Sequence, residues 1–243
     1  MFSQFFRRAA LLLLIPIACW GEAASLEPTL AVGHWPPYID QSAPSEGILA
    51  RRVLDIYQEA GIAPRLVFGS WTEVVEQHLK KPNHLSFGWV KNSERLKKWH
   101  YSDAIMETVV GLWVRTTFNQ PVTDYTHLKP YLVGVSRYTS YGQEFEENKH
   151  IFRKAEFVKE GQGFSMLIDG RIDAFIGDPS IGEYYLSRHQ DWQSKVYFLR
   201  TPIFSTTSLH MICEKSHPDC LKHIEQFNRA LKRHKRIYSA VAN

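Results

Sequence analysis

Short runs of hydrophobic residues alternate along the chain with stretches in which apolar residues recur every three or four positions. The short runs predict strands, at 30–33, 65–68, 85–89, 109–114, 128–136, 156–158, within 170–178, at 196–199 and at 208–213. The periodic stretches predict helices at 47–60, 71–79, 163–168 and 217–238. They also predict one helix that begins at 92 or 93 and another, after residue 140, that ends at 148. This alternation of strands and helices is typical of α/β folds with parallel sheets.

Polar residues that can cap helices precede several of the periodic stretches. Asn92 stands before one of them, and its side-chain oxygen can accept from free backbone N–H groups. Ser140 and Gln143 have the spacing of a capping box. Asp178 followed by Pro179 is typical of an N-cap with proline at the first helical position. These residues predict where three helices begin.

The N-terminal segment has the pattern of a cleaved export signal. Arg7 and Arg8 precede an apolar run at 9–18 that is too short to span a bilayer, and small residues follow. We therefore expect residues 1–24 to be a signal peptide and the mature protein to reach the periplasm. A lipoprotein signal acylated at Cys19 is the less favoured alternative, and no later segment is apolar enough to be transmembrane.

The net charge of the chain is too small to indicate an extended basic surface for nucleic acid. The formal net charge is +4, and it becomes +3 once the predicted signal peptide is removed. Basic residues cluster at 232–236, on the last predicted helix, where a solvated face is the simpler interpretation. We therefore expect no nucleic-acid partner.

The mature chain contains two cysteines, Cys213 and Cys220. In an oxidising compartment, six intervening residues can close into a small disulfide loop. His217 lies between them, but two cysteines and one histidine are fewer than the four ligands of a structural zinc site. A disulfide and no metal site is the prediction.

No catalytic motif is evident. The sequence contains no GxSxG, HExxH or P-loop pattern and no GxGxxG after a strand, and its histidines are scattered. We therefore expect a protein that is not an enzyme and that needs no cofactor.

Two stretches resemble a known family. Residues 85–104 (LSFGWVKNSERLKKWHYSDA) consist of a strand, Asn-Ser-Glu-Arg, a basic turn, an aromatic residue and Ser-Asp. This stretch resembles the end of the first-lobe sheet in extracellular solute-binding protein family 3, where the arginine closes an S/T-x-x-R pattern and Asn92 replaces the common Thr. Those proteins are periplasmic receptors for amino acids, and the matching arginine holds the α-carboxylate of the ligand. The run 170–178 resembles the family's G-x-x-D-A strand with an aspartate at its tip, which pairs with the ligand's α-ammonium. The resemblance implies these roles for Arg95 and Asp178.

Further binding residues follow from the same resemblance. Trp35, in an aromatic-Pro-Pro-aromatic segment that ends at Tyr38, corresponds to the aromatic residue that packs on the ligand, and Ser140 to a carboxylate-binding position. The remaining expected ligand contacts are Tyr38, Trp71, Gly88 and Val90. The chain departs from the family because Gly88, Trp89 and Val90 stand where Ser or Thr usually precedes the arginine. That difference favours a larger or more apolar ligand.

The resemblance implies a two-lobed type II periplasmic binding protein, in which each lobe is a mostly parallel sheet flanked by helices and two crossover strands join the lobes. We expect lobe 1 at 25–114 and 206–243, and lobe 2 at 115–205. The implied function is binding of an amino acid or a similar small carboxylated solute by a monomer that serves an ABC-type permease. Two alternatives remain at this point: an enzyme of the same fold, similar to cyclohexadienyl dehydratase, and a ligand sensor not tied to transport.

Overall fold

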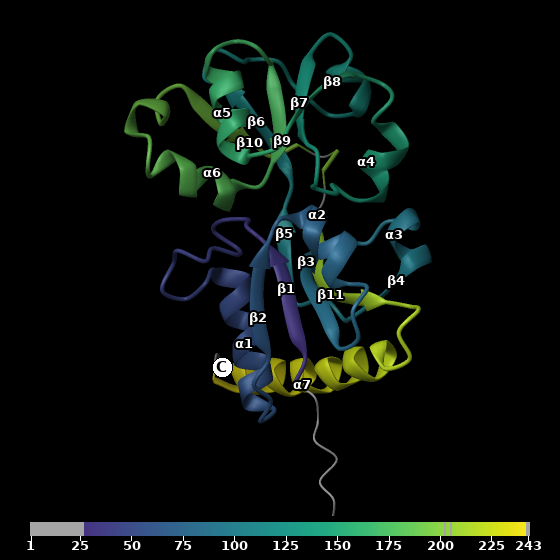
Figure 1. Cartoon of the computed structure of the whole chain (residues 1–243). Coiled ribbons are helices and arrows are strands. Elements are labelled where there is room, and N and C mark those ends of the chain that lie inside the picture. Colours follow the sequence, from purple (N-terminus) through teal and green to yellow (C-terminus); the bar gives the residue numbers. More distant parts are fainter. Residues whose placement is uncertain (1–26, 202, 205, 242–243) are drawn as a thin grey trace, which may run out of the picture.

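The computed structural model describes residues 27–201, 203–204 and 206–241, with side chains up to 237. The predicted signal peptide at 1–24 and Cys19 lie outside the described residues. The described chain forms two sheets with flanking helices, one above the other in Figure 1. We call the first sheet and its helices lobe 1, and the second sheet and its helices lobe 2.

Lobe 1 contains a sheet with the order β2-β1-β3-β11-β4, and β5 also pairs with β11. Its strands are β1 (Thr29–Gly33), β2 (Arg65–Gly69), β3 (His84–Trp89), β4 (Trp99–Tyr101), β5 (Met106–Val109) and β11 (Thr206–Glu214). Its helical segments are α1 (Ile48–Glu59), α2 (Trp71–Glu73), the π-helix η1 (Val74–His78), α3 (Ser93–Lys98) and α7 (Cys220–Val241).

Lobe 2 contains a sheet with the order β10-β6-β9-β7-β8. Its strands are β6 (Gly111–Arg115), β7 (Leu132–Ser136), β8 (Arg153–Phe157), β9 (Ala174–Gly177) and β10 (Val196–Leu199). Its helical segments are the 3-10 helix η2 (Tyr125–Leu128), α4 (Gln143–Asn148), α5 (Glu160–Ile168), α6 (Pro179–Leu186) and the 3-10 helix η3 (Gln190–Trp192).

Each sheet is mostly parallel, as predicted, with one strand that runs against the others. In lobe 1 the antiparallel strand is β11, which pairs with β3, β4 and β5. In lobe 2 it is β6, which pairs with β9 and β10. Each of these two strands directly follows a segment in which the chain crosses from one sheet to the other. The C-terminal ends of the parallel strands can therefore face the same junction.

The strand predicted at 109–114 is two strands. β5 ends at Val109 in the sheet of lobe 1, and β6 begins at Gly111 in the sheet of lobe 2, so the chain changes sheets at Val110. Hydrophobic periodicity does not reveal this break, because the apolar run continues through Val110 without a polar residue. Gly111 permits the close approach of β10, since a Cβ there would lie 2.5 Å from a ring carbon of Phe198. The expected lobe boundary after residue 114 therefore falls inside lobe 2 as the sheets define it.

Each lobe buries its own apolar core. In lobe 1, side chains of the sheet such as Leu30 and Phe87 pack with Leu49 of α1 and Phe227 of α7. α7 runs across the end of lobe 1 farthest from lobe 2 (Figure 1). It begins three residues later than predicted, at Cys220. No helix in the part of the chain that the structure describes is long and apolar enough to cross a membrane.

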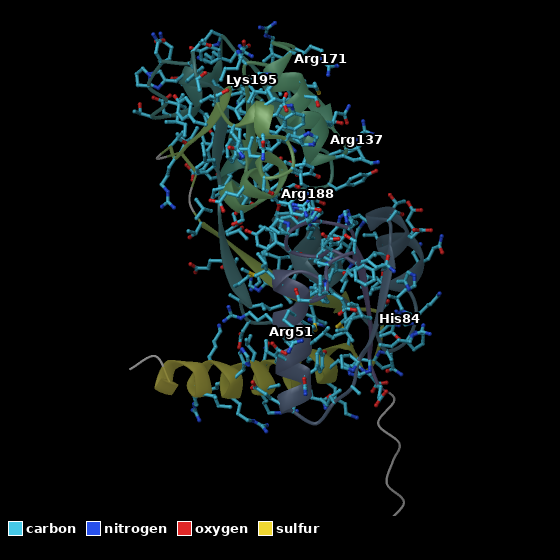
Figure 2. All side chains as sticks on the ribbon, turned by 90° about the vertical axis from the view of Figure 1, so that its left-hand side faces the viewer. Arg51, His84, Arg137, Arg171, Arg188 and Lys195 are labelled. Atoms are coloured by element: carbon cyan, nitrogen blue, oxygen red, sulfur yellow. A yellow bond between two sulfur atoms is a disulfide. The ribbon has the colours of Figure 1, made fainter. Side chains whose placement is uncertain are left out.

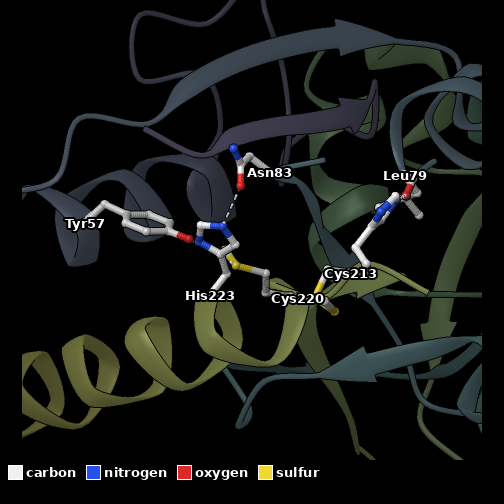
Figure 3. The surroundings of a disulfide bond; sticks show 8 residues. Tyr57, Leu79, Asn83, Cys213, Cys220 and His223 are labelled. Carbon is white, nitrogen blue, oxygen red and sulfur yellow. Dashed lines mark hydrogen bonds between the residues drawn. A yellow bond between two sulfur atoms is a disulfide. The ribbon is translucent and has the colours of Figure 1, made fainter. Parts of the chain in front are cut away.

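The predicted disulfide is present. Cys213 of β11 and Cys220 of α7 are bonded, with Cα atoms 5.6 Å apart, and both residues are buried. One turn further along α7, His223 points toward Asn83, and its Nε2 lies 3.0 Å from Oδ1 of that residue (Figure 3). The disulfide therefore joins the central antiparallel strand of lobe 1 to the helix that covers its core.

Replacement of both cysteines by serine should lower the free energy of unfolding. Loss of a short disulfide loop costs about 2.5 kcal/mol in the chain-entropy account. For a chain of this size, that is a fall in melting temperature of roughly 5–10 °C. Thermal unfolding of the variant and of the wild type, each with and without reductant, measures it. An equal melting temperature in oxidised wild type and variant would contradict this stabilising role.

Candidate functional site

A cavity of about 440 Å³ lies between the two sheets. Its walls come from residues that follow the C-terminal ends of β1, β2 and β3 in lobe 1 and of β7 and β8 in lobe 2. Ligand clefts form at such strand ends because the loops that follow neighbouring strands leave a crevice between them. The residues that line the cavity include Trp35, Trp71, Gly88, Val90, Arg95, Ser140 and Glu160.

Arg95 is the cation of the lobe 1 wall. It lies in the first turn of α3, and its backbone N–H donates to the predicted cap Asn92 at 2.8 Å. Its guanidinium donates to the carbonyl oxygens of Val90 at 3.1 Å and Tyr138 at 3.4 Å, and lies 5.0 Å from the ring of Trp89.

The guanidinium of Arg95 lacks an anionic partner. Among the described residues no carboxylate lies within the 4.0 Å of an ion pair with it. Burial lowers the pKa of Arg95 because removal from water disfavours the charged form. The group still carries its charge at neutral pH, since arginine remains protonated in proteins. A carboxylate that entered the cavity would meet a fork of N–H donors suited to it.

Aromatic side chains form much of the remaining wall. Trp71 and Trp89 meet edge to face, with ring centroids 5.2 Å apart. Trp35 lies against Tyr38 with centroids 4.6 Å apart, and the turn that holds it is closed by two backbone hydrogen bonds with Ile39. The indole Nε1 of Trp35 is buried and has no hydrogen-bond partner among the described residues. The wall therefore offers flat apolar surface and one unused N–H donor.

Ser140 lines the cavity, but it does not cap a helix. α4 begins at Gln143, and its N-cap is Gly142, with a φ of 95° and no side-chain cap. The predicted capping box is therefore wrong. The adjacent Tyr141 is buried, and its hydroxyl accepts from the backbone N–H of Ser136 at 2.8 Å, which holds the chain in a loop until the glycine turns it into the helix. The Ser140 hydroxyl instead accepts from the Asn92 side chain at 3.3 Å, across the junction between the lobes.

Asp178 and Tyr38 lie beside the cavity and not on its wall. The Tyr38 hydroxyl donates to Oδ1 of Asp178 at 2.9 Å, and the same oxygen accepts from the backbone N–H of Ser180 at 2.7 Å as the predicted N-cap of α6. Oδ2 accepts from the backbone N–H of Val109 at 3.2 Å. Burial raises the pKa of Asp178. This carboxyl group therefore joins the two lobes as well as capping a helix.

Sequence reasoning missed Glu160, the buried acid of the lobe 2 wall. It is the first residue of α5 and about nine-tenths buried, and its Oε2 has no hydrogen-bond partner among the described residues. Burial raises the pKa of Glu160 to about 8, a hydrogen bond with Ser136 lowers it in part, and the charge of Asp178 raises it further. Its position directly after a parallel strand was the available signal.

The structure thus brings six of the predicted residues, Trp35, Trp71, Gly88, Val90, Arg95 and Ser140, to one cavity. It leaves Asp178 and Tyr38 beside that cavity and adds Glu160. Gly88 has a φ of 92°, which favours glycine. No cluster of three or more metal-binding side chains occurs within the described residues. The role of each residue toward a ligand stays a prediction.

Solved structures with the same architecture are numerous. ArgBP from T. maritima is 18% identical, with a TM-score of 0.65 over 85% of this chain and 89% of that one. The GluR0 ligand-binding core from Nostoc punctiforme, in complex with L-glutamate, is 17% identical, with a TM-score of 0.68 over 88% and 96%. The arginine-, lysine-, histidine-binding protein ArtJ from Geobacillus stearothermophilus is 19% identical, with a TM-score of 0.66 over 85% and 88%.

The chain has the two-lobed periplasmic binding protein fold. The predicted fold class is confirmed. No protein-family model and no curated protein sequence matches the chain. At these identities the likeness concerns the fold, so the chemistry of the site has to be argued from its own residues.

The pKa of Glu160 predicts how stability depends on pH without ligand. The native state holds this proton up to about pH 8, whereas the carboxyl group of the unfolded chain loses it near its ordinary pKa of 4.5. The stabilisation is therefore complete below the unfolded pKa and is lost as pH rises toward 8, by up to about 1.4 kcal/mol per pH unit for one proton. Glu160→Gln should flatten this slope.

Urea unfolding of wild type and Glu160→Gln between pH 5 and 8.5, without ligand, measures the difference. Asp178, Tyr141 and Tyr185 also interact with Glu160 and are present in both proteins, so the comparison isolates Glu160. Parallel curves would show that Glu160 does not carry a raised pKa.

Proposed function

We propose that the chain is a solute-binding protein that holds an amino acid or a similar small carboxylated solute in the cavity between its lobes. The observation that carries the proposal is Arg95, a half-buried guanidinium on the cavity wall without a carboxylate partner among the described residues. A carboxylated ligand would neutralise a charge that is costly to leave alone when the cavity excludes water.

Other wall residues fit the same ligand. The Ser140 hydroxyl can donate to a carboxylate oxygen, the Val90 carbonyl holds the Arg95 guanidinium in place, and Gly88 lines the same cavity. Trp35 and Trp71 offer apolar faces for the body of the solute. Several structural neighbours bind amino acids by their own descriptions, namely L-glutamate for GluR0, arginine for ArgBP and arginine, lysine and histidine for ArtJ. Their range of ligands supports the class of solute and does not favour one member.

Two passages between the sheets suit a hinge. The chain changes sheets at Val110 and again between Leu199 and Thr206. Closure of two lobes around a ligand is an established motion of periplasmic binding proteins as a class. In this proposal, export through residues 1–24 brings a monomeric receptor to the periplasm, where it delivers its solute to an ABC-type permease.

One observation favours a second candidate. A carboxyl group with a pKa near neutrality inside a cleft, as in Glu160, is suited to proton transfer. An enzyme of the same fold would turn a carboxylated substrate over instead of releasing it unchanged. Incubation with prephenate and arogenate, followed by product analysis, distinguishes the two. The binding proposal predicts no product.

Arg95→Ala should abolish stabilisation by carboxylated ligands. A ligand at about 100 times its Kd adds roughly 2.7 kcal/mol to the free energy of unfolding. For a chain of this size, that is a rise in melting temperature of about 5–10 °C. Thermal unfolding of protein refolded free of bound solute, against a panel of amino acids, measures the rise. The variant should show no rise and a ligand-free melting temperature close to that of the wild type.

Arg171→Ala is the matched control. Arg171 is exposed, pairs with Asp169 at 3.4 Å and lies at the end of lobe 2 far from the junction (Figure 2). It should keep the full ligand response. If no amino acid or related carboxylate stabilises the wild type, or if Arg95→Ala responds as the control does, the proposed function fails.

A further inference from the structure

A small recess lies beside the main cavity. Its volume is about 30 Å³, and it shares Trp35, Val90, Thr139, Ser140 and Glu160 with the cavity wall. That volume matches the space of one water molecule, which is also the size of an ammonium group. The other side of the recess includes Asp178. The recess is therefore a space for one small polar group, flanked by two carboxyl side chains.

The two carboxyl groups differ in how many hydrogen bonds they already accept. Oδ1 of Asp178 already accepts from Tyr38 and Ser180, and Oδ2 from Val109. Oε2 of Glu160 is buried and accepts nothing among the described residues. A buried oxygen without a donor is costly and rare in native structures. Glu160 is thus the acid that needs a donor in this recess.

The recess adjoins the part of the cavity wall that holds Arg95. Val90 lines both the cavity and the recess, and its carbonyl oxygen accepts from Arg95 at 3.1 Å. A carboxylate bound at Arg95 would therefore share Val90 as a neighbour with a group in the recess. In an α-amino acid the ammonium and the carboxylate are attached to the same carbon atom. One ligand of this type can satisfy Arg95 and Glu160 together.

We propose that the recess receives the ammonium group of a zwitterionic α-amino acid, and that Glu160 is the carboxylate that neutralises it. This inference rests on the proposed function, because Arg95 must hold the carboxylate of the same ligand. Asp178 retains its structural bonds and adds negative charge to the recess from the far side. The ligand class follows: a carboxylate without an ammonium group leaves Glu160 unsatisfied.

The wall also selects the side chain of the ligand. When Arg95 and Glu160 are paired with the ligand, two other groups of lysine, arginine, histidine or acid type remain among the described residues of the cavity wall. They are the exposed Lys159 and the titratable His34. The wall also includes the aromatic side chains of Trp35, Trp71, Trp89, Tyr138 and Tyr185. A guanidinium or ammonium side chain finds no second anion there. The site should therefore prefer an apolar or aromatic amino acid to arginine.

Binding should release a proton from Glu160. Without ligand this carboxyl group is neutral at pH 7, because burial and the charge of Asp178 raise its pKa to about 8. The ammonium group takes the place of that proton, which passes to the buffer. The titratable or charged groups that face Glu160 are Asp178 and Tyr185 from α6, Tyr141 before α4, and Lys159 next to it, with Arg95 and His34 across the cavity.

The experiment is calorimetric titration with two matched probes, L-phenylalanine and 3-phenylpropanoate, which differ only in the ammonium group. We expect Glu160→Gln to weaken L-phenylalanine binding by about 30-fold or more, since a buried charge loses its partner. It should leave 3-phenylpropanoate unchanged or bound more tightly. In the wild type, the Kd for L-phenylalanine should fall about tenfold per pH unit from pH 6 to 8, while in Glu160→Gln it should stay nearly flat.

Asp178→Asn is the comparison that separates the two acids. It keeps an oxygen for the bonds with Tyr38 and Ser180, and a melting curve shows whether it folds. If Asp178→Asn removes the preference for L-phenylalanine and Glu160→Gln keeps both the preference and the pH slope, the inference is overturned. If the wild type binds L-phenylalanine with no proton release, it is overturned as well. Binding of neither probe, nor of any other amino acid, would instead refute the proposed function.

Discussion

The two lobes hold ionisable side chains between them that are largely removed from water. A charged or polar group removed from water without a partner costs several kcal/mol. The cavity wall nevertheless holds Arg95, without an anion among the described residues, and Glu160, with an unpartnered oxygen. The fold places them there because both follow the ends of parallel strands, one in each sheet. A ligand with both charges would relieve both costs.

The lobes also contact each other directly. Tyr38 donates to Asp178 at 2.9 Å, Tyr184 donates to Asp40 at 3.2 Å, and Asn92 donates to Ser140 at 3.3 Å. Each bond joins one lobe to the other near the cavity. Asp178 is therefore at once a helix cap, a bridge between lobes and a wall of the recess. Ligand binding and the relative placement of the lobes are coupled through the same few side chains.

Local sequence patterns predicted most of the fold. Hydrophobic alternation located β3, and the caps Asn92 and Asp178 lie where helices begin, because these features depend on neighbouring residues alone. The capping role of Ser140 failed because the burial of Tyr141, a tertiary effect, delays the helix to Gly142. The break at Val110 was not predicted, because a continuous apolar run does not indicate which sheet each of its parts joins.

The candidate site was predictable only in part for the same reason. The resemblance of 85–104 to the receptor family indicated Arg95, and the structure places it on the cavity wall. The position of Glu160 after a strand does not distinguish it from other acids in the first turn of a helix, which are ordinarily solvated. Its significance arises from burial against Ser136 and Asp178, which come from distant parts of the chain. Long-range packing, and not the motif, decides which acid lacks a partner.

The central claim is that one zwitterionic, apolar amino acid occupies the cavity. Native mass spectrometry of the protein, freed of bound solute and then incubated with an equimolar mixture of the twenty common amino acids, tests it most directly. We expect a single retained ligand in a one-to-one complex, drawn from the apolar or aromatic amino acids. Retention of arginine, lysine or glutamate in preference to these would contradict it.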